Sequence, residues 1–148
     1  MNFNYKSEKF DVYPLFGDLL KGEPYVFNFS SKNSKTLDYN LNNFQEFNEA
    51  IFNELKSSGA KWGIGKYLEE RRNILRGSIN IINEKRIYHI GLDIIVPFNS
   101  VLFCPIDGYV YKLGKETQKG NYGGYLILKH KIKNQTFYSL YGHLKTPH

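Results

Sequence analysis

The chain has 148 residues, a formal net charge of +6, and 41% hydrophobic and 16% aromatic residues. This length suits one domain with a core of its own, and this apolar content excludes a disordered tail. The only cysteine, Cys104, excludes an intrachain disulfide and is predicted to be a small buried side chain rather than a nucleophile.

The N-terminus and the hydropathy pattern indicate where in the cell the protein is expected. No stretch has the length of a membrane helix, and the first residues lack the basic start and apolar run of a secretory signal. The sequence as written therefore predicts a cytoplasmic protein, with the cell envelope as the alternative if the N-terminus extends further.

Basic residues outnumber acidic ones, which favours anionic partners. The basic residues are not strongly gathered into blocks along the sequence, and their densest cluster is Lys129, Lys131 and Lys133. We read most of them as solvated surface and expect no specific nucleic-acid partner, because no stacking aromatics stand at the places an RNA-binding sheet would need. The oligomeric state stays unknown.

Residues 1–77 are predicted to form an N-terminal region with one amphipathic helix. Apolar residues recur at spacings of three and four between residues 43 and 56, namely Phe44, Phe47, Ile51 and Leu55. Asn42 or Asn43 can cap the start of this helix and Gly59 can end it. A second, short helix is expected over residues 67–72, and a short strand over residues 27–30.

Residues 78–148 are predicted to form a β-rich module. Short strands separated by turn signals are expected over residues 78–82, 86–89, 93–96, 101–103, 108–113, 125–130 and 136–141. Strands this close together, without helices between them, favour an antiparallel sheet. The predicted fold class is α+β, a helical N-terminal region followed by an antiparallel β-sandwich or barrel-like module.

The candidate chemistry lies among four histidines, His89, His130, His143 and His148. His89 and Asp93 have the spacing His-x-x-x-Asp, which in a straight strand would hold them ~13 Å apart. Zinc needs its ligand atoms at ~2.0–2.2 Å, so a shared ion requires a bend, which Gly91 can supply. On spacing alone, an ordinary strand end with a surface histidine and aspartate explains the pattern as well.

His143 follows Gly142 at the end of a predicted strand. Strand alternation would place it on one face with Phe137, Ser139 and Tyr141. A neutral imidazole there could take a proton from a water molecule held by a metal, although a histidine hydrogen-bonded at the sheet rim is the simpler interpretation. His130 ends an apolar run and is predicted to be structural or exposed.

Taken together, four segments in order resemble the lysostaphin- and LytM-type zinc metallopeptidases, which are peptidoglycan endopeptidases with a duplicated hybrid motif fold. They are the His-x-x-x-Asp strand at residues 86–94, the Pro- and Gly-containing run at 96–110, the Gly-rich hairpin and strand at 121–130, and Tyr-Gly-His-Leu at 141–144. Residues 65–71 also look like the leader segment in one branch of this family.

The resemblance implies that His89 and Asp93 are zinc ligands and that His143 is a catalytic histidine. The third ligand of the family belongs to a later His-x-His pair, which this sequence lacks, so the resemblance also implies a C-terminally truncated module. His148 is not expected to replace that ligand. The implied activity is a zinc metalloendopeptidase that hydrolyses peptide bonds in peptidoglycan cross-bridges.

Two alternatives stay open: an inactive LytM-like binding or regulatory module, and a sugar- or phosphocarrier-binding β-module. The peptidase interpretation makes three geometric or binding predictions. The nearest nitrogen and oxygen atoms of His89 and Asp93 should lie within ~4 Å. His143 should open into the same cleft, and this chain should bind zinc weakly and show little peptidase activity.

Overall fold

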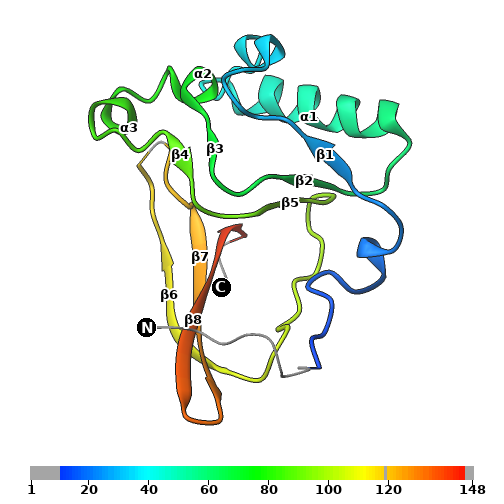
Figure 1. Ribbon diagram of the computed structural model, residues 1–148, viewed down its shortest axis with the longest axis vertical. Helices are drawn as coiled ribbons and strands as arrows, with labels where there is room; N and C mark the ends of the chain where they lie inside the picture. The colour runs from blue at the N-terminus through cyan, green and yellow to red at the C-terminus, as the bar shows by residue number, and fades with distance from the viewer. Residues whose placement is uncertain (1–10, 119, 146–148) are drawn as a thin grey trace.

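The computed structural model describes residues 11–118 and 120–145 (Figure 1). The first part of the chain mixes helices with short strands, and longer strands follow. In order they are η1 Gly17–Leu20, β1 Tyr25–Phe27, η2 Ser34–Leu37, α1 Phe44–Ser58, β2 Gly63–Gly65, β3 Glu69–Glu70, α2 Arg72–Leu75, α3 Ile79–Asn83, β4 Tyr88–His89, β5 Asp93–Ile95, β6 Tyr109–Lys115, β7 Gly124–Ile132 and β8 Gln135–Leu144.

Helix α1 confirms the predicted amphipathic helix. The Asn43 side chain accepts a hydrogen bond from the Glu46 backbone N–H, and Gly59 ends the helix in the left-handed conformation at φ 76°. The apolar stripe of α1 packs on the strands beside it, and Ile51 and Leu55 are buried. The core cluster joins this helix to β1 and consists of Phe27, Phe29, Tyr39, Ile51, Leu55 and Ile74.

The described residues form three small sheets. Strand β2 pairs in parallel with β1 and antiparallel with β5, while β3 pairs antiparallel with β4. Strands β6, β7 and β8 form an antiparallel sheet in the order β6-β7-β8, which extends away from α1 in Figure 1. Both β2–β5 and β3–β4 therefore join residues on the two sides of position 77.

The α+β class is confirmed by this mixture of helices and small sheets, and the described residues form no closed barrel. Strands β5, β6, β7 and β8 overlap four of the predicted strands, and β4 forms the end of a fifth. In the part of the chain that the structure describes, no helix is both long and apolar enough to cross a membrane.

Two predicted elements have the wrong type. The strand expected over 78–82 is helix α3, in which the Ile82 N–H donates to the Ser78 carbonyl at 3.1 Å. The helix expected over 67–72 is strand β3 followed by α2, because Leu68 takes a left-handed φ of 59° and its N–H bonds to His89 instead. Both segments are too short for hydrophobic period to distinguish helix from strand.

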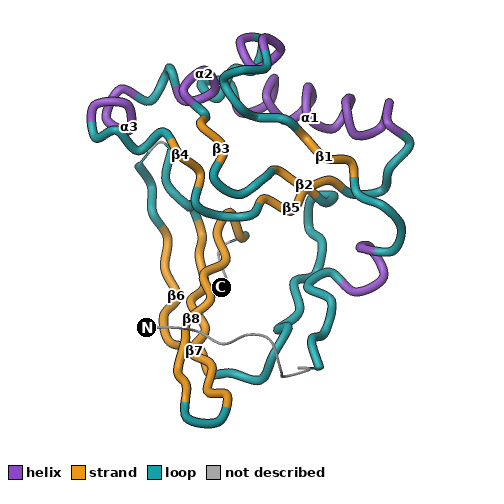
Figure 2. Tube along the Cα trace, viewed as in Figure 1, coloured by secondary structure: helices purple, strands orange, loops and turns teal. Residues whose placement is uncertain are grey.

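No strand forms at residues 101–103, where a short strand was predicted. Figure 2 shows loop through most of the segment between β5 and β6. This loop still has backbone partners: the Phe103 N–H donates to Leu15 at 2.8 Å, and the Tyr13 N–H donates to Pro105 at 2.8 Å. An extended segment therefore lies beside the N-terminal part of the described chain without forming a regular ladder.

Candidate metal centre

His89 and Asp93 approach each other where the chain leaves one sheet and enters another. His89 ends β4, which pairs with β3, and Asp93 begins β5, which pairs with β2. The residues between them change direction, and the imidazole of His89 folds over Gly91, where an added β-carbon would lie 3.2 Å from Nε2. The His89 Nε2 atom lies 3.4 Å from Asp93 Oδ1, which meets the distance prediction.

The 3.4 Å separation has a chemical meaning. Two ligands at ~2.1 Å from one ion in tetrahedral geometry are ~3.4 Å apart, whereas a charge-assisted hydrogen bond would draw the atoms to ~2.7–2.9 Å. The other ring nitrogen, Nδ1, is buried and has no hydrogen-bond partner among the described residues. The pair therefore has the spacing of two donors around a shared cation.

Arg71 holds the second oxygen of the same aspartate. Its Nη1 atom lies 2.7 Å from Asp93 Oδ2, and its Nη2 atom lies 2.9 Å from Glu69 Oε2. Glu69 is buried on β3 opposite His89, and its Oε1 atom accepts the Phe29 backbone N–H at 3.2 Å. The arginine side chain also lies over the Phe29 ring at 4.9 Å. These contacts orient the Asp93 carboxylate and leave Oδ1 facing His89.

Sequence reasoning missed Glu69 and Arg71 as site residues. A helix over 67–72 would have placed them on different faces, whereas an extended backbone places residues two apart on one face. The spacing of two between Glu69 and Arg71, at the end of a short strand, was the signal that could have found them.

His143 lies on a different strand from this pair. It lies near the end of β8 in a left-handed conformation at φ 57°, and its backbone N–H donates to the Tyr122 carbonyl at 2.6 Å. Its side chain is exposed, and no hydrogen bond or ion pair joins it to His89 or Asp93 in the described parts of the chain.

His130 has the structural role predicted for it. Its side chain is buried between β6 and β8, with Nδ1 3.0 Å from the Asp107 carbonyl and Nε2 2.7 Å from Ser139 Oγ. Because a carbonyl only accepts, Nδ1 carries the proton of the neutral ring and Nε2 accepts from the Ser139 hydroxyl. The ring stacks on Phe137 at 4.8 Å, so Phe137 and Ser139 share a face as expected.

Two further predictions concern Cys104 and His148. The prediction that Cys104 is buried is wrong: its side chain is exposed, in the loop that follows the backbone pairing of Phe103. His148 lies outside the described residues. Within the described residues, no group of three or more histidine, cysteine, aspartate or glutamate side chains is placed to hold a metal ion.

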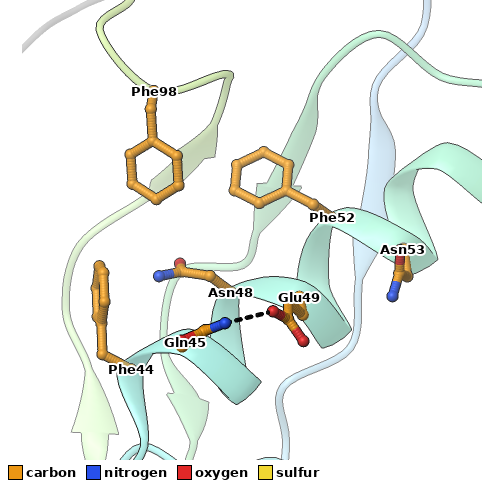
Figure 3. Close-up of a pocket in the computed structure, with 7 residues that line it drawn as sticks. All are labelled: Phe44, Gln45, Asn48, Glu49, Phe52, Asn53 and Phe98. Carbon is orange, nitrogen blue, oxygen red and sulfur yellow. Dashed lines mark hydrogen bonds between the residues drawn. The ribbon is translucent and has the colours of Figure 1, made fainter.

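Two hollows on the surface lie elsewhere. One, of about 410 Å³, is bordered by three phenylalanines from α1 and the β5–β6 loop, Phe44, Phe52 and Phe98, with Phe52 and Phe98 5.6 Å apart between ring centroids (Figure 3). The other, of about 990 Å³, lies between residues 11–14, the loop at 104–107 and the end of β7. Neither hollow is lined by His89, Asp93 or His143.

Comparison of the chain with protein-family models, with curated proteins and with solved structures finds no match.

Proposed function

We propose that this chain is a zinc-metallopeptidase module that hydrolyses peptide bonds in peptidoglycan cross-bridges, with His89 and Asp93 as zinc ligands and His143 as the catalytic histidine. The observation that supports it most is the 3.4 Å separation of His89 Nε2 and Asp93 Oδ1, the spacing of two tetrahedral ligands. The resemblance of four ordered segments to LytM-type peptidases supplies the substrate class. The β6–β7–β8 sheet would then be part of the antiparallel sandwich or barrel-like module of that family.

The donor set fits two of the three protein ligands of a catalytic zinc site. Bound zinc would supply a Lewis acid that polarises the scissile carbonyl and lowers the pKa of water toward neutrality. His89 would bind through Nε2 as a neutral ring, and Asp93 through Oδ1. Arg71 would keep Oδ2 occupied and so hold the aspartate as a one-oxygen ligand.

His143 would handle the proton. A neutral imidazole can accept a proton from the attacking water and return it to the leaving amine. Its exposed side chain at the end of β8 is accessible to a bound peptide. For this role the substrate must lie across both the end of β8 and the His89–Asp93 pair.

Zinc titration by calorimetry tests the ligand assignment, with Co²⁺ as a second probe because its visible absorption reports four-coordinate geometry. With two described donors, we expect weak binding of one ion per chain, and at least ~10-fold weaker binding in His89→Gln and Asp93→Asn. Glu84→Gln is the matched control, since Glu84 is an exposed carboxylate paired with Arg86 at 3.2 Å. Equal affinities for all four proteins would show that the ligand assignment is wrong.

The second candidate is a non-catalytic LytM-like binding or regulatory module. The absence of a third donor among the described residues favours it, as does the arginine that already neutralises Asp93. A cleavage assay on purified peptidoglycan separates the two candidates. For this chain we expect little turnover. Zinc-dependent turnover that His143→Ala lowers by at least ~100-fold would favour the peptidase, and wall binding without turnover would favour the regulatory module.

A further inference from the structure

The net charge of the chain is concentrated in its C-terminal 41 residues. Residues 1–107 contain 13 basic and 13 acidic residues, whereas residues 108–148 contain seven lysines, no arginine and one glutamate. The whole net charge of +6 therefore belongs to the last 41 residues. The expectation that the basic residues are not strongly clustered is wrong when these two parts of the chain are compared. Such a segregated charge attracts anionic partners to one part of the molecule.

One face of the β6–β7–β8 sheet places tyrosines between these lysines. The strand register aligns Tyr109 of β6, Lys129 of β7 and Tyr138 of β8 in one row across the sheet. Residues directly opposite each other in a sheet point to the same side, so this row shares a face. The irregularity in β6 adds Tyr111, whose ring meets that of Tyr138 at 4.9 Å.

We name this surface the tyrosine–lysine face and define it by Tyr109, Tyr111, Lys112, Lys129 and Tyr138. Tyr109 is 78% exposed and Tyr138 is 51% exposed, so large aromatic area is in contact with solvent. Lys112 adds a cation over the ring of Tyr125 at 5.7 Å. The opposite face of the sheet is the one that buries Leu128 and His130. An exposed apolar surface of this kind marks an interaction site.

We propose that the tyrosine–lysine face binds the peptidoglycan polymer through the sugar rings of its glycan strands and the carboxylates of its stem peptides, an inference that rests on the proposed function and names a second contact with its substrate. Tyrosine has an apolar ring and a polar tip, which suits the C–H faces and hydroxyls of sugar rings. Lysine supplies a point charge for the carboxylates of such a polymer. Tyr138 precedes His143 by five residues on β8, a distance of at most ~17 Å along the strand.

The geometry favours this polymer over a single-stranded nucleic acid. Bases stack face to face on flat aromatic platforms, but Tyr111 and Tyr138 meet edge to face at 63°. Tyr109 and Tyr138 are two strand spacings apart, ~10 Å, with Lys129 between them. Phosphate backbones are commonly bound by the forked guanidinium of arginine, and residues 108–148 contain none.

The test is co-sedimentation of the full chain with purified insoluble peptidoglycan sacculi. We expect binding that weakens as salt is raised, and about tenfold weaker binding in the Tyr109→Ala/Tyr138→Ala double variant and in Lys129→Gln. Matched controls are Tyr67→Ala and Lys61→Gln, an exposed tyrosine and an exposed lysine outside the sheet, which should bind as the native chain does. Circular dichroism checks folding, and Lys129→Gln tests the proposal even if the double variant unfolds.

Two outcomes would overturn the proposal: unchanged sedimentation of both face variants, or binding of a thymidine oligonucleotide that sacculi do not compete away. Zinc titration of the same variants separates this proposal from the metal centre. Loss of wall binding with unchanged zinc affinity supports the face independently of the metal centre. Wall binding that survives in His89→Gln, together with unchanged zinc affinity there, would overturn the metal centre and leave the face in place.

Discussion

Two ion pairs of equal sequence spacing offer a direct measure of what burial does at the candidate site. Arg71 pairs with Glu69 at 2.9 Å and Arg72 pairs with Glu70 at 3.1 Å, so the four residues are neighbours in one short segment. The side chains of the first pair are 12% and 7% exposed, and those of the second are 59% and 29% exposed. Arg71 has Asp93 as a second carboxylate partner at 2.7 Å.

We expect Arg71→Met to destabilise the protein far more than Arg72→Met. Removing one member of a buried pair leaves an uncompensated charge, which costs about 3–5 kcal/mol of the free energy of unfolding. Removing one member of an exposed pair costs about 0–1 kcal/mol, because water and salt screen the remaining charge. The methionine keeps most of the apolar stem in both variants, so the difference reports the charge environment of Glu69.

Urea denaturation of the two variants and the native chain at neutral pH measures this difference. Glu69→Gln added to Arg71→Met should recover about half of the lost stability or more, since the orphaned buried charge is then gone. If the unfolding free energies of Arg71→Met and Arg72→Met differ by less than roughly 1 kcal/mol, Glu69 is hydrated in solution and its pair with Arg71 is not effectively buried.

The remaining predictions concern acid stability and a close backbone approach. Glu54 is partly buried, which raises the pKa of its carboxyl, but hydrogen bonds from Lys35, Tyr39 and Tyr25 outweigh this and lower the pKa below its ordinary value. Its stabilising contribution is therefore complete above pH ~4.5 and is lost as the pH falls through the lowered pKa, so the urea midpoints of Glu54→Gln and the native chain should converge in acid. Gly65→Ala should destabilise the fold by about 1–3 kcal/mol in the same assay and weaken zinc binding, because the added β-carbon would lie 2.7 Å from Asp93 Oδ2.

Sequence alone predicted best the elements with long, consistent local signals. Helix α1 spans 15 residues, and its apolar stripe, Asn43 cap and Gly59 terminus all indicate the same structure. Strands β7 and β8 have nine and ten residues, and they overlap the predicted ranges. The segments that were predicted wrongly, at residues 67–72 and 78–82, are both short. The first takes its conformation from tertiary hydrogen bonds such as Arg71 N–H to Ile87, and the second forms a short helix through local bonds such as Ile82 N–H to Ser78.

The proximity of His89 and Asp93 was predicted from their spacing, an assumed bend at Gly91 and the family resemblance. What spacing could not give was the cause of the bend, which is the transfer of the chain from the β3–β4 sheet to the β2–β5 pair. Nor could it give Arg71, which reaches Asp93 from 22 residues earlier in the chain. Contacts of that kind depend on long-range strand pairing, and a single sequence contains no local signal for it.

The same pairing shows that strands β2 and β3 help to position the candidate metal centre. His89 is held in register by Glu69 of β3, and Asp93 by Gly65 of β2. A fragment beginning at residue 78 would contain both proposed ligands but neither partner strand, and Asp93 would lose Arg71 as well. The 3.4 Å geometry that supports the metal proposal is therefore a product of the whole described fold, in which the N-terminal strands position two side chains that the C-terminal part supplies.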